Sequence, residues 1–149
     1  MVMFMMKLTV GLQTLWNAGK GFQMADNMMK VVMVEPGKPA YVTEIPNNLD
    51  GYQQAVGGGL IETIPYLDDA IMVGNEEAKL IGMEGNRRFG DSIVAGPFFI
   101  CGEFEGEDGY EFCSLSDELC AKYVDRFSKP EQISKEEVEG DIEFCIITF

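Results

Sequence analysis

The stretch from residue 74 to residue 91, GNEEAKLIGMEGNRRFGD, holds the side chains whose types and spacing are best suited to binding a ligand. Two Gly-Asn pairs stand eleven residues apart, and two glutamates follow the first pair while two arginines follow the second. Amide and guanidinium groups donate hydrogen bonds, and the guanidinium fork binds two oxygens of one phosphate or carboxylate. We therefore expect this loop to bind a small anionic, nucleotide-like ligand. The expected lining residues are Asn75, Glu76, Asn86, Arg87 and Arg88.

A structural role for the two arginines competes with this hypothesis. Either guanidinium can instead pair with a nearby carboxylate and hold the loop in place. The carboxylates close in sequence belong to Glu76, Glu77 and Asp91. The sequence leaves both interpretations open.

The residues of common catalytic centres are missing. The chain contains no histidine, which excludes a Ser-His-Asp triad and a Cys-His pair. The run of three glycines at 57–59 lacks the Lys-Ser/Thr of a phosphate-binding loop and is typical of a helix end. Adjacent acids at 68–69 and 76–77 are typical of solvated turns. We expect a protein that is not an enzyme and that uses neither a cofactor nor a metal ion.

Charge is distributed unevenly along the chain, whose net charge is −14. Residues 103–149 carry fourteen acidic and four basic residues, a net charge of −10. Such a surface disfavours direct binding to nucleic acid or to anionic lipid. It suits an alternative function, in which the acidic 103–143 face blocks a basic, nucleic-acid-binding host protein by charge mimicry. A solvated acidic surface with no partner is the simpler interpretation.

The N-terminal residues are apolar, but they make a poor signal peptide because Lys7 follows the apolar run instead of preceding it. We expect a cytoplasmic protein with buried, reduced thiols. The cysteines are Cys101, Cys113, Cys120 and Cys145, without Cys-x-x-Cys spacing. Residues 1–28 are expected to form an extension that packs on a second copy of the chain, giving a homo-oligomer, or else on the chain's own sheet.

The remaining pattern predicts a single α+β domain with a mostly antiparallel sheet. Strands are expected at 30–35, 40–45, 60–66, 70–74 and 92–102, the last with Gly96-Pro97 as a bulge or edge position. A shorter helix at 48–57, capped by an asparagine, and a longer helix at 114–128 should pack on one face of that sheet. We expect a core from 29 to 134, followed over 135–149 by an acidic link and a final strand.

Several short motifs follow one another in a fixed order between residues 30 and 131. They are VEPG at 34–37, GG at 57–58, NEE at 75–77 with Lys79 and Gly82, NR at 86–87, Ile93-x-x-Gly96-x-Phe98, SLSDE at 114–118 and PE at 130–131. Together they resemble the phage and mobile-element family called domain of unknown function 3846. The resemblance implies a small accessory protein of the host cytoplasm and no particular activity. In that setting, the expected ligand would be a nucleotide signal of host defence.

Overall fold

The structure is a computed structural model that describes the backbone of residues 27–148 and the side chains of residues 27–141. Most of the 1–28 extension, with its expected packing on a second copy, therefore lies outside the described residues. The strands are β1 Met28–Val34, β2 Tyr41–Pro46, β3 Ile61–Ile64, β4 Ile71–Asn75, β5 Gly85–Phe89, β6 Ser92–Ala95, β7 Phe98–Gly106 and β8 Gly109–Cys113. The helices are α2 Leu49–Ala55, α3 Asp117–Arg126 and α4 Lys135–Thr148.

The fold is α+β, as predicted, with an antiparallel sheet in the order β2-β1-β7-β4-β3. Strand β7 lies at its centre, where Phe99 pairs with Met33 of β1 on one side and with Val73 of β4 on the other. Strand β8 extends the same sheet by pairing with the far half of β7. The expected strands at 30–35 and 40–45 are present as β1 and β2, which pair antiparallel with Val32 opposite Val42.

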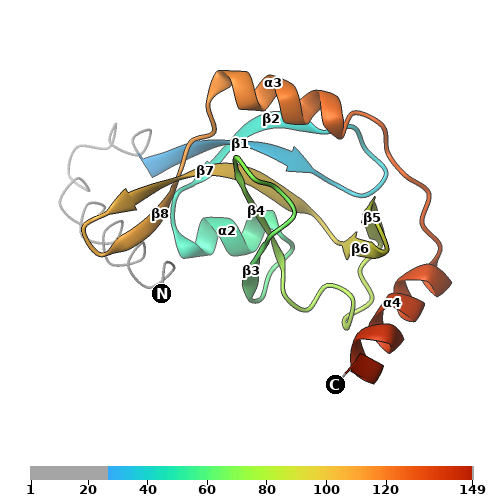
Figure 1. Cartoon of the computed structure of the whole chain (residues 1–149). Coiled ribbons are helices and arrows are strands. Elements are labelled where there is room, and N and C mark those ends of the chain that lie inside the picture. Colours follow the sequence, from blue (N-terminus) through green and yellow to red (C-terminus); the bar gives the residue numbers. More distant parts are fainter. Residues whose placement is uncertain (1–26, 149) are drawn as a thin grey trace.

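The two predicted helices cover opposite faces of the sheet (Figure 1), so the expectation of one shared face was wrong. Alternate residues of β1 and β7 point to the two sides, and both sides are apolar. Met33 and Phe99 pack with Tyr52 of α2, whereas Val34 and Phe98 belong to the cluster that includes Tyr123 of α3. A strand that is buried on both faces has a continuous apolar sequence. Such a sequence does not show which face of the sheet each helix covers.

Helix α2 packs closely on the end of β2. Asn48 caps it, as predicted, by accepting a hydrogen bond from the Gly51 N–H at 2.7 Å. A Cβ atom on Gly51 would stand 2.3 Å from the Pro46 carbonyl oxygen. Glycine at this position therefore lets the helix approach the strand and place the Tyr52 ring 5.3 Å from that of Phe112.

Two segments around the predicted ligand loop differ from expectation. Residues 92–102 form two strands instead of one, because Gly96-Pro97 ends β6 and precedes β7, with Gly96 at a φ of +74°. The stretch 85–89, expected as loop, is strand β5, paired with β6. Gly90 and Asp91 make the two-residue turn between them, and Gly90 has a φ of +63°. A Gly-Asp pair between two strands is a hairpin signal that the charged sequence around it obscured.

The C-terminal segment is also different, since the expected acidic link and final strand form one helix, α4. A capping box begins it: the Ser134 hydroxyl accepts from the Glu137 N–H, and the Glu137 carboxylate accepts from the Ser134 N–H, both at 3.1 Å. Together with the helix-favouring Lys and Glu residues after Ser134, this box outweighs the β-branched end of the segment. No helix in the described part of the chain is long and apolar enough to cross a bilayer.

The two helical glycines should respond oppositely to alanine. Gly51→Ala forces a Cβ atom against the backbone of Pro46, so we expect it to lower the free energy of unfolding by about 1–3 kcal/mol. Gly140 in α4 has open space around it, and Gly140→Ala should add helix stability of about 0.5–1 kcal/mol. Urea unfolding of both variants measures the difference. Equal effects of the two substitutions would contradict the close approach of α2 to β2.

Candidate functional site

The first predicted site residue, Asn75, is buried at the end of β4. Its side-chain amide donates to the carbonyls of Val56 at 3.1 Å and Gly58 at 2.6 Å, and its oxygen accepts from the Glu77 N–H at 2.8 Å. Asn75 thus holds the glycine-rich segment after α2 in place. Its neighbour Glu76 is exposed, and its backbone N–H donates to the Leu60 carbonyl at 2.9 Å.

Asn86 is fully buried and connects the sheet to the β5–β6 hairpin. It occupies a bulge, because the register of β5 against β6 shifts between Gly85 and Arg87. A bulge redirects a side chain, and here the Asn86 amide donates to the Val34 carbonyl at 2.9 Å and to the Gly96 carbonyl at 2.8 Å. Its capacity to donate is therefore used within the fold.

The Arg87 side chain is only 1% exposed, and protein oxygens surround its guanidinium. One terminal nitrogen donates to the Asn86 backbone and side-chain oxygens at 3.1 and 2.7 Å. The other donates to the carbonyls of Lys38 at 2.8 Å and Phe127 at 2.9 Å. Only Nε has no partner among the described residues. Burial lowers the pKa of Arg87, against the opposing charge of Glu131, but an arginine stays protonated.

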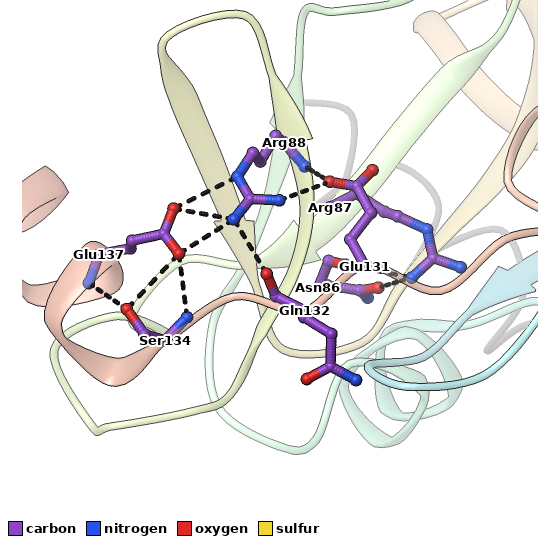
Figure 2. Close-up of polar contacts among 7 residues, drawn as sticks. All are labelled: Asn86, Arg87, Arg88, Glu131, Gln132, Ser134 and Glu137. Atoms are coloured by element: carbon purple, nitrogen blue, oxygen red, sulfur yellow. Dashed lines mark hydrogen bonds and ion pairs between the residues drawn. The ribbon is translucent and has the colours of Figure 1, made fainter.

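Arg88 points away from Arg87 and binds the start of α4, as Figure 2 shows. Its guanidinium contacts both carboxylate oxygens of Glu137 at 2.9 Å, the Gln132 carbonyl at 2.9 Å and the Glu131 carboxylate at 3.4 Å. We call Arg88, Glu131 and Glu137 the Arg88 cluster. The hydrogen bonds from the Arg88 guanidinium hold the pKa of Glu137 below its usual range, and the hydrogen bond from the Ser134 backbone adds to the effect.

The five predicted residues therefore occupy three places: the end of β4, the space between sheet and α3, and the start of α4. The alternative interpretation, an arginine–carboxylate pair, is confirmed for Arg88, but its partners are not the neighbouring acids that we expected. They come from more than 40 residues further along the chain, a contact that spacing alone does not reveal. The capping-box pattern of Ser134 and Glu137 is a sequence signal that could have placed Glu137 at the start of a helix.

A second candidate site is the outer part of the β7–β8 hairpin, residues 103–111, which we call the acidic hairpin. It holds five carboxylates and no basic residue: Glu103, Glu105, Glu107, Asp108 and Glu111. The exposed aromatic Phe104, at 48%, lies opposite Glu111 in the ladder, and Tyr110, at 50%, lies opposite Glu105. The hairpin projects at the end of the sheet far from α4 (Figure 1). Each aromatic ring thus stands beside a carboxylate.

The comparisons with known proteins give one match. The family model described as "Domain of unknown function (DUF3846)" matches residues 29–128, which span β1 through α3. No curated protein and no solved structure matches the chain. The matched range contains Asn75, Asn86 and Arg87 with the carbonyls that they bind, and it stops before the carboxylates of the Arg88 cluster.

Removal of the buried guanidinium should destabilise the whole domain. In Arg87→Met, the carbonyls of Lys38 and Asn86 lose a charged donor, so we expect the free energy of unfolding to fall by about 3 kcal/mol. Arg126→Met is the matched control, because Arg126 is exposed and stacks over the rings of Phe89 and Phe127. Its cost should stay below about 1 kcal/mol. Denaturant unfolding that gives the two variants equal stability would contradict the role assigned to Arg87.

The Arg88 cluster should make the docking of α4 depend on pH. Because the pKa of Glu137 is lowered in the fold, its contribution is complete above the ordinary glutamate pKa of about 4.3 and is lost as pH falls further. Glu137→Gln removes the charge, so amide exchange of residues 135–141 at pH 7 should be roughly two- to fivefold faster. Glu136→Gln, an exposed neighbour on the same helical turn, is the control. Equal exchange in both variants would refute the prediction.

Proposed function

The chain belongs to the DUF3846 family, and we propose that it is a non-enzymatic binding protein whose acidic hairpin holds an arginine-bearing surface of a partner protein. The observation that carries this proposal is the acidic hairpin itself, with five carboxylates, no basic residue and two half-exposed aromatic rings over residues 103–111. The family description assigns no activity, and this surface supports the proposal by its own chemistry.

The residues first expected to bind an anion are a weaker basis for function. Asn75, Asn86 and Arg87 are buried, and the side-chain amides of the two asparagines and the two terminal nitrogens of Arg87 donate to oxygens of the chain itself. Arg88 is more accessible, but Glu131 and Glu137 already neutralise it. A nucleotide would have to displace these partners. Binding of a small anion through these residues stays a prediction, which calorimetry with cyclic and linear nucleotides tests directly.

The acidic hairpin offers the chemistry that an arginine needs. A guanidinium can stack on the face of an aromatic ring while its N–H groups bind a carboxylate. The opposed pairs Glu105–Tyr110 and Glu111–Phe104 supply these two elements together, and the ladder register directs the two pairs to opposite faces of the hairpin. Aromatic residues also supply much of the binding energy at protein interfaces. Each face of the hairpin can therefore bind an arginine side chain.

A basic protein that binds nucleic acid is the class of partner that fits this surface best. Such proteins expose arginines for phosphate contacts, and the hairpin carboxylates would compete for the same side chains. The other acids of the 103–143 region lie on α3, on α4 and, in the case of Glu131, between the two helices. Lys122 and Arg126 interrupt the acidic surface of α3. This distribution of charge favours local binding by the acidic hairpin over mimicry of nucleic acid by one continuous acidic stripe.

Peptides of eight arginines or eight lysines test the proposal by fluorescence anisotropy at physiological salt. We expect the arginine peptide to bind more tightly, and binding to weaken steeply as salt rises because exposed charges are screened. The combined variant Glu103→Gln, Glu105→Gln, Glu107→Gln and Asp108→Asn should weaken arginine-peptide binding roughly tenfold. A second variant, Tyr110→Ser, should remove much of the preference for arginine over lysine.

A control with the same net charge separates the hairpin from the general acidity of the protein. It neutralises four exposed acids elsewhere, namely Glu44, Asp50, Glu118 and Asp125. This variant should retain most of the binding. If both charge variants lose affinity equally, the acidic hairpin is not the binding surface and the proposal fails.

A further inference from the structure

A groove beside α4 has no part in the function proposed for the acidic hairpin, which lies at the opposite end of the molecule (Figure 1). Residues 79–85 line one wall, and Ile133, Lys135, Val138 and Glu139 line the other. Its volume is about 600 Å³, which accommodates a few side chains and not a domain. We call it the α4 groove.

The base of the α4 groove is apolar. Met83 and Ile133 pack there against a buried cluster that includes Val138. Leu80 and Ile81 stand at the rim and are 72% and 59% exposed. Two adjacent aliphatic side chains left in water beside an apolar groove are typical of a surface that a further chain segment covers.

The charges around the α4 groove favour a segment with positive charge. Glu84 and Glu139 line it and form no ion pair within residues 27–141. Lys79 is already paired with Asp141, which leaves Lys135 as the other cation of the lining. An apolar segment that carries lysine and no acid would fit this combination.

The protein itself contains such a segment. Residues 1–24 include no acidic residue, although the chain has 25 of them, and they carry Lys7 and Lys20. Their apolar side chains include Met1, Met3, Phe4, Met5, Met6 and Leu8. Methionines adapt to irregular apolar surfaces, and burial of such residues is favourable by about 25 cal/mol per Å² of apolar area.

We propose that the α4 groove receives residues 1–24 of a second copy of the chain. The donor is assigned to the second copy because the start of β1, which residues 1–24 precede, lies at the opposite end of the sheet from α4 (Figure 1). Exchange of such an arm between two copies buries two grooves in one symmetric dimer. This inference does not depend on the partner of the acidic hairpin.

Amine cross-linking of the full-length protein tests the proposal with its own lysines. A mixture of ¹⁴N- and ¹⁵N-labelled chains is cross-linked and digested, and mass spectrometry reads the linked peptides. We expect Lys7 and Lys20 of one isotope to join Lys79 and Lys135 of the other. Links from the N-terminal lysines only to Lys38, Lys122 or Lys129 would overturn the proposal, and links to the groove within single chains only would overturn the assignment to a second copy.

Matched substitutions at exposed leucine and isoleucine positions complete the test. Ile81→Asp places a charge at the rim, so it should reduce the cross-links to Lys79 and Lys135 at least fivefold and shift the protein from dimer to monomer in light scattering. Leu60→Asp is the control, because Leu60 is similarly exposed, at 53%, and does not line the groove. Cross-link yields and mass that are unchanged in Ile81→Asp would refute the docking.

Discussion

The Arg87 guanidinium joins the three parts that enclose one side of the sheet. It binds the carbonyl of Lys38 in the β1–β2 turn, the carbonyl of Phe127 at the C-cap of α3, and both oxygens of Asn86 in the β5–β6 hairpin. Among the described residues, no carboxylate bonds to it. The negative end of the α3 dipole therefore supplies part of the compensation that a buried cation needs. Each of the three segments is fixed by the same side chain, so none can shift without exposing a charge to an apolar interior.

Two adjacent arginines have acquired different physical roles because a strand sends alternate side chains to opposite sides. Arg87 faces the interior and binds neutral oxygens, whereas Arg88 faces solvent and pairs with Glu131 and Glu137. The inner residue holds the domain core, and the outer one holds the helix that follows it. The family match covers the first arrangement completely and the second only in part, since it stops at residue 128. The partners that attach α4 through Arg88 thus lie outside the range that the family model matches.

Sequence reasoning recovered the elements whose signals are local. The asparagine cap of α2 and the longer helix α3 both depend on neighbouring residues, and the structure contains them. Sequence reasoning failed where a segment's structure depends on contacts with residues outside that segment. The stretch GNRRF reads as a polar loop until β6 pairs with it and α3 covers Arg87. Likewise, DIEFCII reads as a strand because its β-branched residues are visible in the sequence, whereas the capping box that begins the helix lies seven residues earlier.

The central position of β7 has a consequence for how the chain is made. Both β1 and β4 pair with β7, which begins only at Phe98. During synthesis, the first 97 residues can form the hairpins β1–β2 and β3–β4, but each then presents an unpaired apolar edge. The two hairpins have no strand to join them until β7 leaves the ribosome. A newly made chain therefore passes through a period in which two hairpins with unpaired apolar edges coexist, and this period ends only when β7 pairs with both of them.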